Sequence, residues 1–255
     1  ILDQLITIKF MPKKSYSVFV GEKIKNFRKT IFVDSDKSLS IRYLLIGAIS
    51  EGISEIRNIL ESDDVISTMN CLKKLGIKIK KTGKKKYLVY GKGLGSFQIK
   101  KGSSLDFGNS GTLARLLIGI LSSTPNIEIN VKGDKSLNKR NMSKLIDLMS
   151  EFGAQFYPKN RDNFPLKIIS SAIPVGIKYN AGVSAQLKSA VILAGLNSFG
   201  VTNIYEKYKS RDHTENILEK NSKTLKKINN NIKIRGKGFI NSIKTIVPGD
   251  PSTSA

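Results

Sequence analysis

The residues best suited to chemistry lie in one short turn, where glycines flank small polar side chains and an apolar helix follows. This turn spans residues 108–112 (GNSGT), and Arg115 stands in the first turn of the expected helix. Glycine lets the backbone approach a ligand closely, and the free N–H groups and positive dipole end of a helix N-terminus attract negative charge. The pattern therefore predicts an anion-binding site, although an ordinary helix capped by Ser110 or Thr112 would use the same residue types.

Two other stretches resemble this one, DKSLSIR at 36–42 and VSAQLKS at 183–189. Each begins the first helix of a series of helix, strand, helix, strand and strand, which recurs at a spacing of about 70–75 residues. Three copies of one unit predict a pseudo-threefold α/β domain with helices buried against sheets. The three helix N-termini would then converge on one cationic, amide-rich face, or they are simply three independent caps.

Helices and strands are expected from apolar periodicity and from capping residues. The first helix is capped by Asp36 or Ser38 and ended by Gly52, and the second begins at residues 62–64 and is closed by Gly76. Further helices are predicted at 111–121, 139–152, 184–196 and 213–227. Strands are predicted within 16–33 and at 54–59, 77–80, 86–90, 127–132, 154–158, 165–169, 201–206 and 231–235.

Composition narrows the function classes. The chain has 255 residues, 40% of them apolar, and a formal net charge of +23. That charge suggests a nucleic-acid partner, but the lysines are scattered and only 7% of residues are aromatic, so a basic surface for anionic substrates fits better. Cys71 is the only cysteine and His213 the only histidine, so neither an internal disulfide nor a Cys/His metal site is expected. A reducing cytoplasmic setting fits this composition. No apolar run suggests a membrane span or a signal peptide.

Five motifs then carry a resemblance. DKSLSIR, LDFGNSGTLARLL, GDKSLNKRNM, VSAQLKSAVILAGL and SRDHTE occur in this order over about Asp34 to Ala255. Together they resemble the 5-enolpyruvylshikimate-3-phosphate synthase family, the 3-phosphoshikimate 1-carboxyvinyltransferases. The resemblance implies the enolpyruvyl transferase fold, an inverted α/β barrel-like arrangement with two domains of three βαβαββ units each.

By this resemblance, residues 1–33 are N-terminal strands of a discontinuous lower domain, residues 34–244 form the upper domain, and residues 245–255 cross back into the lower domain. The chain opens on Ile1 rather than Met and stops within a glycine-containing turn, so we expect a partial sequence with the second domain largely missing. The acid–base groups of the reaction are expected beyond Ala255. No catalytic residue is then assigned within this chain, and no useful turnover is expected from it alone.

The family transfers the enolpyruvyl group of phosphoenolpyruvate to the 5-hydroxyl of shikimate 3-phosphate and releases phosphate. It implies two small-molecule substrates, no metal, no organic cofactor, no membrane or nucleic-acid partner, and a monomer. By motif, the residues matching the shikimate 3-phosphate site are Lys37, Ser38, Arg42, Ser184, Ala185, Gln186 and Arg211. Those matching the phosphoenolpyruvate site are Lys37, Asn109, Gly111, Thr112, Arg140 and Gln186. Gly111 in place of alanine favours sensitivity to glyphosate.

Several residues are left open or depart from the family pattern. Asn141 replaces a proline, and the pair at 34–35 replaces Pro-Gly, which puts loop geometry in doubt. Arg115 either contacts substrate or pairs with a carboxylate, and Lys188 is expected to support the site rather than touch a ligand. Residues 63–64 are expected to cap a helix, not to act as paired acids, and His213 to begin a helix.

The main rival function is the sister enzyme that loads the same group onto UDP-N-acetylglucosamine. That enzyme commonly uses a cysteine in a loop of the phosphoenolpyruvate site. Cys71 instead falls on the apolar face of an expected helix, which predicts a core position.

Overall fold

The computed structural model describes residues 33–100 and 102–250, so the strands predicted within 16–33 lie outside them except for Val33, as does the segment 251–255. The helices are α1 Lys37–Ile49, α2 Asp63–Lys74, α3 Gly111–Ser123, α4 Ser143–Glu151, α5 Ala185–Leu196 and α6 His213–Asn221, with a short 3₁₀ helix, η1, at Leu137–Lys139. The strands are β1 Glu51–Arg57, β2 Lys78–Gly83, β3 Lys86–Lys92, β4 Ser104–Asp106, β5 Glu128–Lys132, β6 Gln155–Tyr157, β7 Leu166–Ile169, β8 Lys178–Ala181, β9 Val201–Glu206, β10 Leu225–Ile228, β11 Asn231–Arg235 and β12 Lys244–Ile246.

Three four-stranded sheets repeat one topology. Their strand orders are β12-β1-β3-β2, β4-β5-β7-β6 and β8-β9-β11-β10. In each sheet the first two strands are parallel and the remaining pairs are antiparallel. The predicted pseudo-threefold α/β fold is therefore confirmed, with one feature that the sequence did not indicate: the first sheet takes its parallel strand, β12, from the far end of the chain.

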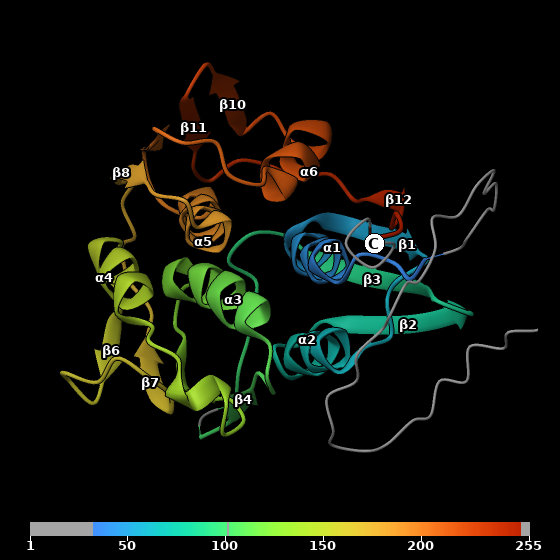
Figure 1. The fold of residues 1–255 in the computed structure, drawn as a ribbon, viewed down its shortest axis with the longest axis horizontal. Coiled ribbons are helices and arrows are strands. Elements are labelled where there is room, and N and C mark those ends of the chain that lie inside the picture. Colours follow the sequence, from blue (N-terminus) through green and yellow to red (C-terminus); the bar gives the residue numbers. More distant parts are fainter. Residues whose placement is uncertain (1–32, 101, 251–255) are drawn as a thin grey trace, which may run out of the picture. The chain divides into compact units, whose positions relative to one another are not determined.

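The two kinds of helix differ because their sequences differ. Helices α1, α3 and α5 are apolar around most of their circumference, and in α5 every residue from Lys188 to Leu196 is buried. Such helices are stable only inside a core. They lie side by side in the interior, with the sheets arranged around them (Figure 1). Helices α2, α4 and α6 are half exposed, as expected for amphipathic helices that cover an edge.

The repeat extends to single hydrogen bonds at both ends of the inner helices. Their N-caps Asp36, Ser110 and Ser184 are 74 residues apart, and each side chain accepts a bond from the backbone N–H three residues later. At the other end, hydroxyl groups of Ser50, Thr124 and Ser198 each donate to the carbonyl four residues earlier. The three helices therefore begin and end in the same way.

The boundaries of some elements were predicted wrongly. Gly52 does not end α1, which stops at Ile49, but lies within β1 with a φ of 92°. Helix α4 begins at Ser143 rather than 139, because Arg140 is extended. Helix α6 ends at Asn221, and residues 225–228 form β10 instead of continuing it to Lys227. The remaining predicted helices and strands from 54 onward are present.

Strand β12 crosses the boundary predicted between residues 244 and 245, and it pairs with β1. The chain is also tied together beside that strand. Ser35 forms an isolated antiparallel bridge with Gly249, and the backbone N–H of Asp36 donates to the carbonyl of Pro248. Residues 34–35, the pair that departs from the family pattern, are therefore held in extended form. The division into domains remains a prediction.

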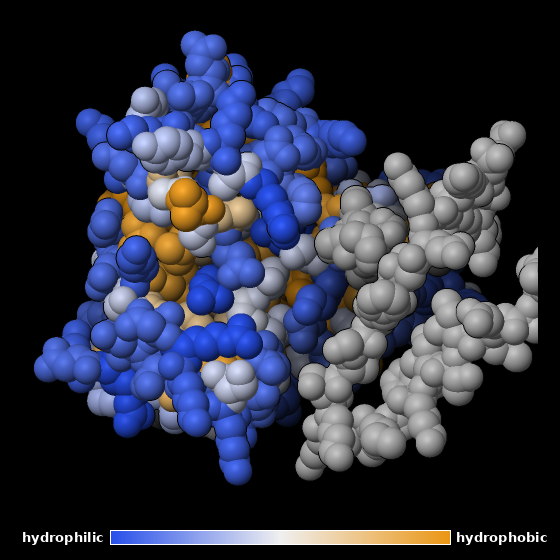
Figure 2. All heavy atoms as spheres, in the orientation of Figure 1, coloured by the Kyte–Doolittle hydropathy of each residue, from blue (hydrophilic) through white to orange (hydrophobic). Residues whose placement is uncertain are grey.

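Hydrophilic residues cover most of the face seen in Figure 2, as the basic composition requires, and hydrophobic ones gather around α5. None of the helices within residues 33–250 is long and apolar enough to cross a membrane. The described part of the chain also holds no group of three His, Cys, Asp or Glu side chains arranged for a metal ion.

The crossing of α3 and α5 generates a stability prediction. A Cβ atom on Gly119 would lie 2.6 Å from the Ala190 carbonyl oxygen and 2.9 Å from its Cα. We expect Gly119→Ala to lower the free energy of unfolding by roughly 1–3 kcal/mol, despite the better helix propensity of alanine, because two backbones must separate. Urea unfolding measures the change. Gly182→Ala is the matched control, since nothing lies within 4 Å of its Cβ, and equal stability of the two variants would contradict the prediction.

Candidate active site

One cavity of about 270 Å³ opens where the N-termini of the inner helices meet. Its lining comes from three repeats and from the loop before α4. The lining residues are Lys37, Asp64, Asn109, Gly111, Thr112, Arg115, Arg140 and Gln186. All six residues predicted for the phosphoenolpyruvate site are among them. The structure thus brings together residues up to 149 positions apart in sequence.

Arg140 is positioned by the loop that follows β5. The Asp134 carboxylate caps η1 by accepting a bond from the backbone N–H of Leu137 at 2.7 Å. Leu137 is fully buried, and a side chain on Gly133 would collide with it. Directly after this 3₁₀ turn, Arg140 extends toward the α3 turn and its Nη2 donates to Asn109 Oδ1 at 2.7 Å. Two residues predicted to bind the same ligand therefore orient each other.

Gln186 joins α5 to α3 through its side-chain amide. Its Nε2 donates to Thr112 Oγ1 at 2.9 Å, and its Oε1 accepts from Arg115 Nη1 at 3.0 Å. Arg115 also donates to the Gly111 carbonyl. Arg115 therefore lines the cavity and is held by neutral oxygens, and within the described residues it has no carboxylate partner, which was the alternative. Burial and then the neighbouring Arg140 lower its pKa.

Lys37 and Asp64 also line the cavity. Lys37 is the first residue of α1, and its Nζ lies 3.1 Å from Asp64 Oδ2 in the first turn of α2. The prediction that residues 63–64 cap this helix was wrong in detail, since Ser62 is the N-cap and Asp64 faces the cavity. Sequence reasoning missed Asp64, because acidic residues in a first helical turn also have a local explanation.

The cavity is suited to anions. Three of the lining side chains are cations, Lys37, Arg115 and Arg140, against the single carboxylate of Asp64. The N-terminus of α3 opens at the same place, so its unpaired amides add positive potential. A Cβ atom on Gly111 would lie 2.8 Å from Arg115 Nη1 and 2.9 Å from Arg140 Nη1. The absence of a side chain there keeps the space between the two guanidinium groups open.

Arg42 lies apart from this cavity, on the buried side of α1. Only 3% of it is exposed, and burial lowers its pKa to about 10, although Glu215 and Asp36 raise it. Its Nη1 donates to the Ser38 carbonyl at 3.1 Å, so the predicted pair Ser38 and Arg42 is in contact. Arg211 is exposed and close enough to lower the pKa of Arg42 further.

A neighbouring cavity of about 210 Å³ shares a wall with the first. Arg115 and Gln186 line both, and Ser184, Asn141 and Lys144 line the second. Ser184, the N-cap of α5, lines the second cavity, and Ala185, the first residue of the helix, lines neither. The predicted residues other than Ala185 thus divide between two adjoining cavities and the Arg42 side of α1. Their roles as ligand contacts remain predictions.

Asn141 and His213 both lie at the start of a helix. Asn141, in place of proline, accepts bonds at its Oδ1 from the backbone N–H and the hydroxyl of Ser143, and so starts α4 with a polar turn. His213 is the first residue of α6, as expected, and burial and then Arg42 lower its pKa.

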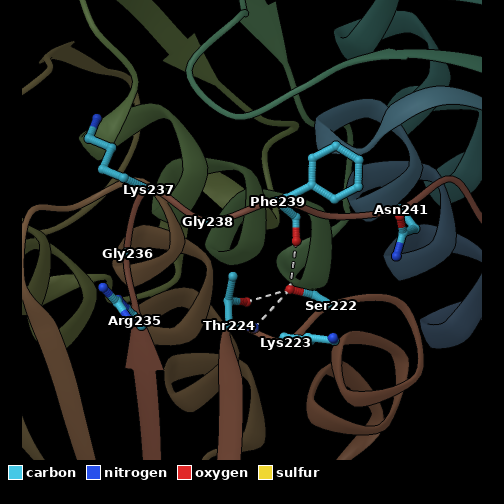
Figure 3. A pocket seen from close by; sticks show the side chains of 9 residues that line it. All are labelled: Ser222, Lys223, Thr224, Arg235, Gly236, Lys237, Gly238, Phe239 and Asn241. Carbon is cyan, nitrogen blue, oxygen red and sulfur yellow. Dashed lines mark hydrogen bonds between the residues drawn. The ribbon is translucent and has the colours of Figure 1, made fainter.

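A larger cleft of about 490 Å³ lies at the other end of α5 (Figure 3). Lys237, in its wall, donates its backbone N–H to the carbonyl of Leu196, the last residue of that helix. Ser222 bonds Thr224 and the Phe239 carbonyl, and Lys237 Nζ reaches Asn197. None of the predicted site residues lines this cleft, so we place the candidate active site at the helix N-termini.

Comparisons with known proteins show the family of the chain. Residues 21–255 match the family model of EPSP synthase (3-phosphoshikimate 1-carboxyvinyltransferase). The chain belongs to the EPSP synthase family. It is 40% identical over 233 residues to the 3-phosphoshikimate 1-carboxyvinyltransferase of Bacillus cytotoxicus, covering 91% of this chain and 54% of the relative. The enzyme of Leuconostoc mesenteroides is 41% identical over 226 residues, covering 88% and 51% of the two chains.

A solved EPSP synthase structure from Acinetobacter baumannii superposes with a TM-score of 0.81 at 33% identity, covering 88% of this chain and 50% of that one. The enolpyruvyl transferase fold is therefore the fold of this family member. The chain spans about half the length of the curated relatives it matches.

The environment of Cys71 generates a prediction about reactivity. The thiol is on α2, 1% exposed, and bonds the Asp106 carbonyl, and burial raises its pKa to about 12. The predicted core position is confirmed. Because the thiolate is the reactive form, Cys71 should react with a disulfide reagent at pH 8 far more slowly in the native chain than in urea. Equal rates would show that the thiol is accessible.

Proposed function

We propose that this family member takes part in the transfer of the enolpyruvyl group of phosphoenolpyruvate to the 5-hydroxyl of shikimate 3-phosphate, with release of phosphate. The observation that carries the proposal is the shared cavity of Lys37, Asn109, Gly111, Thr112, Arg140 and Gln186. Relatives that bear the name of this activity, with identities of 35–41%, give it further support.

The proposed reaction requires cationic side chains that bind anionic substrates, and the site contains such side chains. Both substrates are phosphorylated carboxylates, and charge-assisted bonds from arginine and lysine hold such groups firmly. In this proposal Lys37, Arg115, Arg140 and the α3 amides hold phosphoenolpyruvate, while Arg42, Ser184 and Arg211 hold shikimate 3-phosphate. Gln186, which lines both cavities, stands between them. Holding two anions together against their repulsion is itself a large part of catalysis.

The reaction steps follow from the resemblance. The 5-hydroxyl adds to C2 of phosphoenolpyruvate while a proton goes to C3, and the resulting tetrahedral ketal loses inorganic phosphate and a proton to restore the double bond. No metal or organic cofactor enters this scheme. A cytoplasmic location, a monomeric state and the lack of a nucleic-acid partner also remain predictions.

Calorimetric titration with shikimate 3-phosphate tests the proposal. Binding rather than turnover is measured because the chain spans about half the length of its relatives. We expect saturable heat of binding. The affinity should fall at least roughly tenfold in Gln186→Ala and in Arg42→Ala, since each change removes hydrogen bonds to a charged ligand. Arg235→Ala, an exposed arginine in the distant cleft, should bind normally. Heat with UDP-N-acetylglucosamine instead would favour the sister reaction.

The space between Arg115 and Arg140 gives a second prediction. Gly111→Ala would place a methyl group within 3 Å of both guanidinium groups. In the presence of shikimate 3-phosphate, we expect this variant to bind phosphoenolpyruvate at least roughly tenfold more weakly while keeping its affinity for shikimate 3-phosphate. Titration of each ligand in turn measures both values. Unchanged phosphoenolpyruvate affinity would mean that the phosphate or carboxylate does not lie in this space.

A further inference from the structure

Two buried hydroxyl groups contact the guanidinium group of Arg42. Arg42 Nε donates to Thr214 Oγ1 at 2.9 Å, and Arg42 Nη2 donates to Ser189 Oγ at 3.3 Å. Thr214 and Ser189 are 0% and 1% exposed. Thr214 is on α6 and Ser189 is on α5, so two hydroxyl groups of the third repeat hold a side chain of the first. We call these two hydroxyl groups the seat of Arg42.

The direction of this hydrogen-bond chain is fixed. Arginine can only donate, so Thr214 must accept from Arg42 and is free to donate its own proton to Ser189 Oγ, 2.8 Å away. Ser189 in turn donates to the carbonyl of Ala185 at 2.7 Å. The series of hydrogen bonds therefore has one donor-to-acceptor direction, from Arg42 through the two hydroxyl groups to the carbonyl of the first residue of α5. Ala185 and Arg42 were both assigned to the shikimate 3-phosphate site.

The seat itself is held by a neighbouring ion cluster. Glu215 follows Thr214 on α6, and Lys188 precedes Ser189 on α5. Lys188 Nζ lies 2.6 Å from Glu215 Oε1 and 2.5 Å from Glu206 Oε1 on β9, and the lysine is fully buried. Breaking a buried ion pair by removing one partner is strongly unfavourable, so this cluster fixes α6 against α5. Thr214 consequently has one position relative to Ser189.

The arrangement leaves Arg42 oriented but not neutralised. Its three bonded acceptors, on Ser38, Ser189 and Thr214, are neutral oxygens. Of the five N–H groups of a guanidinium, two, one on each Nη, have no acceptor within the described residues. The carboxylates of Glu215 and Asp36 act on it electrostatically rather than as bonded partners. A cation held in this way retains the capacity to bind an anion.

We propose that Thr214 and Ser189 are positioning residues, which aim the two unpaired N–H groups of Arg42 at an anionic group of shikimate 3-phosphate. The inference rests on the proposed function for the identity of the ligand. It goes beyond that function by assigning a role to two residues that do not touch the substrate themselves.

Three variants separate positioning from packing. Thr214→Val keeps the shape but removes the hydroxyl, and Thr214→Ser keeps the hydroxyl. Thr202→Val is the matched control: Thr202 is also a fully buried threonine, on β9, and its hydroxyl has no hydrogen-bond partner within the described residues. Thermal unfolding of each variant shows that it is folded.

Two measurements are made on each variant. In the ligand-free chain, NMR of the arginine Nε–H groups follows exchange of the Arg42 proton with water, with Arg42→Lys identifying its signal. We expect exchange at least roughly tenfold faster in Thr214→Val, because a hydrogen-bonded buried proton is protected. Calorimetry should show at least roughly tenfold weaker binding of shikimate 3-phosphate by the same variant. Thr214→Ser and Thr202→Val should resemble the original chain in both.

The exchange rate and the binding affinity test different parts of the inference. Faster exchange in Thr214→Val with unchanged affinity, or unchanged exchange, would overturn the inference, and so would an equal loss of affinity in Thr202→Val. If the original chain takes up no shikimate 3-phosphate, the proposed function fails for this chain. The exchange rate then decides alone whether Thr214 holds Arg42.

Discussion

The candidate site depends on the burial of three helix bodies. Helices α1, α3 and α5 are apolar on nearly all sides, so each must be surrounded by the protein, and only its ends remain near the surface. The sheets supply the surroundings, and the glycine at 119 lets α3 and α5 approach to backbone contact. Function is thereby confined to helix ends, and the N-terminal ends are the ones that attract anions.

The three repeats place different side chains at equivalent helix N-termini. The three N-caps are equivalent in position, yet each is followed by different side chains: Lys37 on α1, Thr112 on α3 and Gln186 on α5. Because the caps converge, these unlike side chains face one cavity. A threefold fold thus gives a site without threefold symmetry.

Much of this could be predicted from sequence because its signals are local. Capping residues and helix periodicity identified the inner helices, and the resemblance to the family identified six of the eight residues that line the cavity. Short strands such as β8 were missed since three or four residues carry little pattern. Residues 222–228 kept helical spacing, yet Leu225 pairs with Ile234 in a sheet, and that tertiary pairing decided the outcome. The seat of Arg42 was not visible either, because Thr214 lies 172 residues from it.

The two buried cations Lys188 and Arg42 have different kinds of partner, and this difference separates a structural role from a binding role. Lys188 donates a hydrogen bond to Glu206 and forms an ion pair with Glu215, and these contacts hold α5, α6 and β9 together. Arg42 on α1 donates, among the residues that the structure describes, to hydroxyl and carbonyl oxygens only. A bonded carboxylate would orient the guanidinium equally well but would compete with any anionic ligand. Hydroxyl groups orient it at little electrostatic cost, so the charge that folding buries here remains available for binding.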